Sequence, residues 1–212
     1  FIMDGNNRWS KKKNLKLFDS YYKGGLKLLK LSNFIFSNYQ TNYISAFALS
    51  SNNLRRPKYI ISTIKKVLNE FLHQLDKKDF HFNIHFIGNL SFLDDKIIKK
   101  ITDIENINSE SKKKLIIFLN YSGRADINNA FQRKNSNNYK KLDISSSLVT
   151  SEIPDPDLLI RTGGYQRISD FLLYELAFTE LIFTKILWPD LEISNIKRYI
   201  HKFNNIERKF GF

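Results

Sequence analysis

Asp4 and Arg8 lie four residues apart in the opening segment FIMDGNNRWS, directly after an apolar run at residues 1–3. The side-chain amides of Asn6 and Asn7 lie between them. A carboxylate, a guanidinium group and two amides at the end of a buried strand fit two kinds of feature. One is an ordinary turn, which Gly and Asn favour. The other is a site that holds an anion through a metal ion.

Three more polar clusters follow apolar runs: SSNNLRRP at 50–57, NYSGR at 120–124 and RTGGYQRIS at 161–169. One such cluster alone indicates only a turn. Four of them at the same end of a sheet would form a basic rim rich in Gly and amides. That rim would suit a phosphate or diphosphate, bound by backbone N–H groups and arginine forks. The sequence contains no P-loop, GxGxxG or GxSxG motif.

The elements that must position these clusters alternate along the chain. Short apolar runs predict strands at residues 1–3, 43–49, 82–87, 115–120 and 158–160. Helical spacing predicts helices at 20–39, 59–75, 94–107, 170–178 and 193–210. The alternation predicts an α/β fold: a single domain whose central, mostly parallel sheet is flanked by helices, with ligands beyond the carboxyl ends of the strands. The polar stretch 132–141 is typical of a surface loop.

The chain has 212 residues and a formal charge of +13, with 34 Lys and Arg against 21 Asp and Glu. This charge favours anionic partners, although general use of Lys and Asn along the chain would also explain it. With no Cys, the chain can form neither disulfides nor thiolate metal sites. No apolar stretch reaches the roughly 20 residues that span a bilayer, so we expect a cytoplasmic protein. Because the chain begins inside an apolar run, we expect residues 1–212 to form one domain with an incomplete N-terminus.

Glu180 lies in the aromatic and aliphatic segment DFLLYELAFTELIFTKILWPD. A lone Glu is most often a residue on a helix surface. It could instead be a second oxygen ligand for Mg²⁺ beside Asp4, since Mg²⁺ commonly uses one or two carboxylates together with substrate phosphates.

These segments together resemble the cis-prenyltransferase family, the undecaprenyl diphosphate synthases and their relatives. The resemblance rests on MDGNNRW, FALSSNNLRRP, NYSGR, LLIRTGGYQRISDFLLYELAFTELIFTKILWPD and IERKFGF, in that order. It implies an enzyme that condenses isopentenyl diphosphate units onto an allylic diphosphate, typically farnesyl diphosphate, giving a polyprenyl diphosphate such as undecaprenyl diphosphate. It also implies dependence on Mg²⁺, a hydrophobic tunnel and a homodimer. The apolar product would be delivered to the membrane surface, and no nucleic acid would be a partner.

The resemblance also assigns roles to residues. Asp4 matches the Mg²⁺-positioning aspartate, and Glu180 matches the second metal-associated acid. Asn53 matches an asparagine linked to proton removal; because an amide is a poor base, we assign it to positioning. The substrate-binding positions are Gly5, Asn6, Asn7, Arg8, Trp9, Ser50, Ser51, Arg56, Arg161, Arg167 and Ser169. Trp9 is equally well explained as a core anchor.

The sequence departs from the family pattern at several positions. Asn7 and Ser122 replace glycines, and we expect Asn7 to tolerate a positive φ there. Leu17 and Tyr21 stand where an Arg and a His are common, with Lys16 as the substitute cation. Tyr165 and Gln166 replace Glu and His, which puts a His contribution near the metal in doubt.

Two questions stay open at this stage. His81 and His85 could form a metal pair, although histidines with partners in a strand are the commoner case. An active cis-prenyltransferase is the leading hypothesis. The alternatives are a weakly active or non-catalytic subunit of a heteromeric prenyltransferase and a basic nucleic-acid-binding module.

Overall fold

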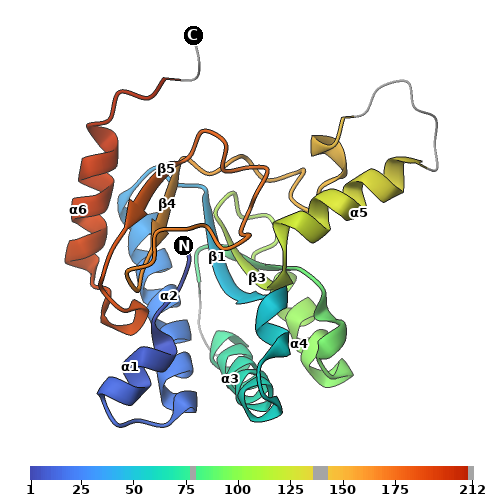
Figure 1. Ribbon diagram of the computed structural model, residues 1–212, viewed down its shortest axis with the longest axis vertical. Helices are drawn as coiled ribbons and strands as arrows, with labels where there is room; N and C mark the ends of the chain where they lie inside the picture. Colours follow the sequence, from blue (N-terminus) through green and yellow to red (C-terminus); the bar gives the residue numbers. More distant parts are fainter. Residues whose placement is uncertain (77–79, 136–142, 210–212) are drawn as a thin grey trace.

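A parallel sheet organises the chain, and long helices pack against it (Figure 1). The computed structural model describes residues 1–76, 80–135 and 143–209. The strands are β1 (Tyr43–Ser50), β2 (Asn83–Ile87), β3 (Lys114–Tyr121), β4 (Leu158–Arg161) and β5 (Glu180–Phe183). The helices are α1 (Asn6–Lys12), α2 (Leu17–Asn38), α3 (Lys58–Asp76), α4 (Asp95–Glu105), α5 (Gly123–Asn135) and α6 (Ile193–Asn204).

The strand order is β2-β3-β1 in one part of the sheet and β4-β5 in the other, with every pair parallel. Ile2 joins the two parts, because it forms parallel bridges to Phe47 of β1 and Arg161 of β4. Its N–H donates to the carbonyl of Ile160 at 3.0 Å. The parallel α/β fold is therefore confirmed. Because all strands point the same way, their carboxyl ends lie at one edge, where the polar clusters follow.

Side chains alternate between two hydrophobic cores along the strands. On one face, Leu115, Ile117 and Leu119 of β3 pack with buried residues of α2, α3, α4 and α6. On the other, Ile116 and Phe118 of β3 pack with Phe171 and the segment around residues 153–176. Near-continuous apolar strands are what a sheet covered on both faces requires.

Four predicted helices are confirmed as α2, α3, α4 and α6, with ends shifted by at most three residues in the first three. The prediction of 193–210 is wrong at its end, because α6 stops at Asn204 and residues 205–209 are not helical. The predicted helix at 170–178 is wrong. Ser169, Asp170 and Leu172 have φ values of 53°, 66° and 44°, which a right-handed helix cannot include. Phe171 nevertheless anchors this segment, because its ring stacks on Phe47 with centroids 4.5 Å apart.

The sequence prediction missed α1, α5 and β5. Residues 132–135 belong to α5, so the loop predicted at 132–141 is wrong there, and the remainder lies outside the described residues. Ser122 immediately precedes α5 and caps its N-terminus: its Oγ accepts from the N–H of Ala125 at 3.2 Å. A serine that caps a helix explains how this position differs from the glycine of the family pattern.

Candidate active site

Asp4 is the carboxylate at the centre of the site. Its Oδ1 accepts from Arg8 Nη2 at 3.2 Å and its Oδ2 accepts from Arg161 Nη2 at 3.0 Å. The Asp4 side chain is 29% exposed, so both arginines share an acid that water and ligands still reach. The spacing of Asp4 and Arg8 therefore reflects an ion pair across the start of α1.

Arg161 reaches this acid from the end of β4 and is itself buried, with 4% of its surface exposed. Its Nη1 donates to Ser169 Oγ at 2.6 Å and to the carbonyl of Arg167. Two segments far apart in sequence, the one with Asp4 and residues 161–169, thus meet at one guanidinium group. The structure brings the predicted residues Asp4, Arg8, Arg161 and Ser169 together.

The two residues that follow Arg161 in the chain hold the segment containing Asp4 in place. The buried Thr162 donates its Oγ1–H to the carbonyl of Asp4 at 2.7 Å. Gly163 has φ +83°, and a Cβ there would lie 2.5 Å from Arg8 Nη2 and 3.1 Å from Asp4 Cγ. A glycine is needed at this position both for its backbone conformation and for the close approach of Arg8.

Asn7 does not have the positive φ expected from its family position. It lies inside α1, and the left-handed residue is Gly5, with φ 114°. The helix begins immediately after Gly5, so replacing a glycine by Asn at position 7 imposes no such strain. Asn6 donates its Nδ2–H to the carbonyl of Met3 at 3.1 Å.

Trp9 is buried, with 3% of its surface exposed, and its Nε1–H donates to Asp190 Oδ1 at 2.7 Å. It therefore has the anchoring role that the sequence left open. Its contact with substrate stays a prediction.

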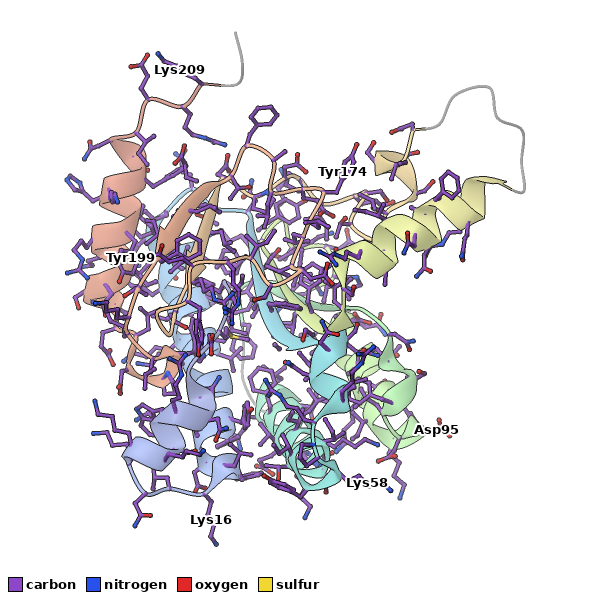
Figure 2. The ribbon with its side chains drawn as sticks, viewed as in Figure 1. Lys16, Lys58, Asp95, Tyr174, Tyr199 and Lys209 are labelled. Carbon is purple, nitrogen blue, oxygen red and sulfur yellow. The ribbon has the colours of Figure 1, made fainter. Side chains whose placement is uncertain are left out.

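The second predicted cluster forms a capped 3₁₀ turn, η1 (Ser51–Arg55), after β1. Ser50 and Asn53 cap it reciprocally: Ser50 Oγ accepts from the N–H of Asn53 at 3.3 Å, and Asn53 Oδ1 accepts from the N–H of Ser50 at 3.4 Å. Arg56 Nη1 donates to Tyr21 Oη at 3.1 Å. Tyr21 belongs to α2 and stands at the family's usual His position. Its hydroxyl thus holds Arg56 against α2. Lys16 is exposed at the lower end of the molecule (Figure 2).

The third cluster is tied to the fourth through Asp170. Ser122 Oγ donates to Asp170 Oδ2 at 2.5 Å, and the N–H of Arg124 donates to Asp170 Oδ1 at 3.0 Å. Asp170 adjoins Ser169, which contacts Arg161. The expectation that the clusters gather at one edge of the sheet is confirmed.

An apolar cavity of about 100 Å³ opens beside Asn6 and Tyr21, between α2 and α3. Its walls include Leu28, Leu68, Phe71 and Leu119, and Trp188 closes one side. The hydrophobic tunnel itself stays a prediction. A larger cavity of about 630 Å³ adjoins Phe1 and the start of β1. It lies at the opposite end of the strands from Asp4, so it is not part of this site.

Glu180 does not join Asp4 within one chain. It opens β5 and pairs with Leu158, whereas Arg161 pairs with Phe183. Three residues of extended strand span about 10 Å, which is more than a Glu side chain reaches. Among the described residues no group of three His, Asp or Glu side chains could hold a metal ion. One carboxylate at Asp4 still fits a Mg²⁺ ion that takes its other ligands from substrate phosphates.

The predicted histidine pair is resolved in favour of a structural partner. His85 Nδ1 lies 2.8 Å from Glu105 Oε1, and the same oxygen accepts from the N–H of Phe86. His81 precedes β2 and is exposed. Glu105 thus secures His85 to the end of α4.

Sequence reasoning missed two groups of polar residues. Tyr165, noted only as a departure, has three arginines around its ring. On the other side of Asp170, Asp126 and Glu175 are buried with Tyr121 and Thr150. Burial raises the pKa of both carboxyls and of the Tyr121 phenol. The sequence feature that could have predicted this cluster is Glu175, an acid that lies inside an apolar run.

The chain belongs to the cis-prenyltransferase family. The family model described as "Putative undecaprenyl diphosphate synthase" matches residues 2–211. An isoprenyl transferase of Aquifex pyrophilus is 35% identical over 99% of this chain and 93% of its own length. Dehydrodolichyl diphosphate synthase 3 of Arabidopsis thaliana is 34% identical over 99% of this chain and 74% of its own length.

Solved structures agree with this assignment. A probable undecaprenyl diphosphate synthase from Campylobacter jejuni superimposes with a TM-score of 0.80 at 29% identity, covering 89% of this chain and 92% of that one. Lavandulyl diphosphate synthase from Lavandula x intermedia, in complex with dimethylallyl diphosphate, shares the fold with a TM-score of 0.89 at 24% identity, covering 100% of this chain and 96% of that one. By name, these relatives are isoprenyl transferases or isoprenoid diphosphate synthases.

Proposed function

We propose that the chain is an active, Mg²⁺-dependent cis-prenyltransferase. It condenses isopentenyl diphosphate units onto an allylic diphosphate, farnesyl diphosphate in the first instance, to give a long-chain product such as undecaprenyl diphosphate. The observation that carries the proposal is the meeting of Asp4, Arg8, Arg161 and Ser169 beside an apolar cavity. A diphosphate needs the cations, and a prenyl tail needs the cavity.

The arginines bind and orient the diphosphates in this proposal. Arg161 is already held by Asp4 and Ser169, so its positive charge stays in place without reorganisation when charge develops on the leaving group. Asp4 would hold Mg²⁺, whose charge would oppose that developing charge. Arg8 is more exposed than Arg161, with 46% of its side chain accessible, and can exchange its contact with Asp4 for a phosphate oxygen.

Asn53 positions the isopentenyl group. Its Oδ1 is engaged in the cap of η1, which fixes the side chain at the end of β1. Because an amide is a poor base, a diphosphate oxygen or a water receives the proton. Arg56, held by Tyr21, supplies a further cation beside this residue.

The apolar cavity between α2 and α3 receives the prenyl tail. Burying each five-carbon unit contributes on the order of 4 kcal/mol, at about 0.8 kcal/mol per CH₂. The cavity of about 100 Å³ is smaller than typical ligand pockets of roughly 300–1,000 Å³. A long product therefore requires α2 and α3 to separate around Phe71, which packs against Gly25.

A homodimer would reconcile Glu180 with the proposed metal site. Glu180 is too far from Asp4 in its own chain, so a role as metal ligand requires Glu180 of a second copy. Exposed apolar residues lie near it in the sequence: Leu181 is 44% exposed, Phe178 59% and Tyr174 45%. Where exposed apolar residues form a contiguous patch, that patch is typical of an interaction surface. Sedimentation of Phe178→Glu beside the parent chain tests this: a parent dimer that the substitution breaks is expected, and a monomeric parent refutes it.

Delivery of an apolar product suggests peripheral binding at an anionic membrane surface. None of the helices in the described part of the chain combines the length and apolar character needed to cross a bilayer. The last turn of α1 and the residues after it instead include exposed Lys11, Lys12 and Lys13, followed by Leu15, which is 44% exposed. Each lysine near an anionic surface contributes about 1 kcal/mol. Co-sedimentation should show binding to vesicles with 30% phosphatidylglycerol and none to neutral vesicles.

The decisive experiment is elongation by the purified chain with farnesyl diphosphate, labelled isopentenyl diphosphate and Mg²⁺. We expect polyprenyl products that disappear with EDTA. Absence of elongation with the chain alone and with added partner proteins would refute an active enzyme. Elongation only with a partner would support the heteromeric alternative, which the retained site residues do not favour.

A further inference from the structure

Tyr165 lies among three guanidinium groups at the edge of the candidate site. The guanidinium carbons of Arg167, Arg8 and Arg161 lie 4.3, 5.0 and 5.7 Å from the centre of its ring. Cations within about 6 Å of an aromatic face are attracted by the negative potential of that face. The arginines come from α1, from the end of β4 and from the following loop, so Tyr165 is a common partner for three separate segments.

The carboxylates do not balance these arginines. Asp4 pairs with Arg8 and Arg161, and no other ion pair to the three arginines is found within residues 1–76, 80–135 and 143–209. Three guanidinium groups and one carboxylate leave a local charge of about +2. Like charges this close repel one another. The ring of Tyr165 lowers that cost without introducing an anion.

The chemistry of the side chain at position 165 therefore matters for binding an anion. A carboxylate there would pair with the arginines and compete with a ligand for their N–H donors. A tyrosine ring accepts none of these N–H donors and leaves the excess positive charge of the three arginines unneutralised. Gly163 and Gly164, with φ of +83° and +85°, turn the chain between the buried Thr162 and Tyr165.

We propose that Tyr165 is a positioning residue that preorganises Arg8, Arg161 and Arg167 for a diphosphate, so that the site binds the diphosphate group even without a divalent cation. This inference rests on the proposed function for the identity of the ligand as the diphosphate end of a prenyl substrate. The roles of the arginines in binding do not depend on the ring; Tyr165 sets how well they are aligned.

Calorimetric titration with inorganic pyrophosphate in EDTA tests this proposal. The parent chain should bind. Tyr165→Phe should bind within twofold of the parent, because the ring is kept. Tyr165→Ala should bind about threefold to tenfold more weakly, and Tyr165→Glu at least tenfold more weakly. Tyr59→Glu is the matched control for added charge, since Tyr59 is 68% exposed on α3 and should leave affinity within twofold.

Three outcomes would overturn the proposal: no binding of pyrophosphate by the parent in EDTA, Tyr165→Ala equal to the parent, or Tyr165→Phe as weak as Tyr165→Ala. Tyr165 is 45% exposed, and thermal unfolding of each variant separates a loss of binding from a loss of folding. Elongation assays are run separately. If pyrophosphate binds in the expected order but no elongation occurs, the proposed function fails and the role of Tyr165 stands.

Discussion

Two clusters of ionisable side chains flank the segment at Ser169 and Asp170, and they differ in sign and in access to water. On one side, Asp4 pairs with the half-exposed Arg8 and with the buried Arg161, and positive charge is in excess. On the other, Asp126 and Glu175 are only 4% and 5% exposed. No cation lies against Glu175: its Oε1 accepts from Thr150, and its Oε2 has no hydrogen-bond partner among the described residues.

The difference shows how environment decides what a charged residue can do. At the candidate active site, Asp4 and Arg8 are both partly exposed, so a ligand can replace the contact between them. In the buried carboxyl cluster, dehydration raises the pKa of Asp126 and Glu175, so the neutral acids become more favourable. The first arrangement suits binding and catalysis, whereas the second serves packing between α5 and the segment around residues 153–176.

The largest expected effect is a loss of elongation when Asp4, at the centre of the candidate active site, is removed. Asp4→Ala should lower the elongation rate by on the order of 10²–10³-fold, the range seen when one preorganised group that stabilises developing charge is removed. The free energy of unfolding should change by about 1 kcal/mol, because Arg161 keeps its bonds to Ser169 and Arg167. Incorporation of labelled isopentenyl diphosphate and urea unfolding measure the two quantities. Undiminished activity in Asp4→Ala would refute the role given to Asp4.

A smaller effect, on pyrophosphate affinity, distinguishes the displacement of Arg8 from strain in the backbone at the two glycines. Gly163→Ala should destabilise the chain by about 1–3 kcal/mol and lower pyrophosphate affinity, because its Cβ would displace Arg8. Gly164→Ala is the matched control: its φ of +85° gives similar strain, but its Cβ would lie no closer than 3.8 Å to the nearest atom. Calorimetry on both variants is the measurement. Equal affinities for the two variants would show that the approach of Arg8 to Gly163 is unimportant for binding.

The smallest expected effect is a change of stability with pH, which arises in the buried carboxyl cluster and not at the candidate active site. The pKa of Glu175 is raised by burial, so between the unfolded and folded pKa values the folded state binds more protons, and stability falls as pH rises. Glu175→Gln should therefore stabilise the chain at pH 8 by about 1 kcal/mol, raising Tm by about 2–4 °C, with the gain shrinking toward pH 4.

Thermal unfolding of Glu175→Gln at both pH values, beside the exposed Glu152→Gln as a control, measures this difference. Gln keeps an oxygen that can accept from Thr150, so the variant isolates the charge. A gain of the same size at pH 4 and pH 8 would exclude titration of Glu175 as its cause.

The sequence alone determined the parallel α/β fold, four of the long helices and the members of the site. The local pattern was sufficient for these, because apolar periodicity marks elements and each polar cluster directly follows a strand. Asp4, Arg8, Arg161 and Ser169 could be named from motif resemblance before any contact was known.

Only the tertiary structure decided how those residues are partnered. The irregular path at 169–172 depends on Asp170 contacting the start of α5 and on Phe171 packing against Phe47, which are contacts between residues far apart in sequence. The same holds for the distance of Glu180 from Asp4, which follows from strand register, and for the ring of Tyr165 among three arginines. A residue's type fixes what it can donate, accept or repel, whereas its burial and its distant neighbours fix which of these it does.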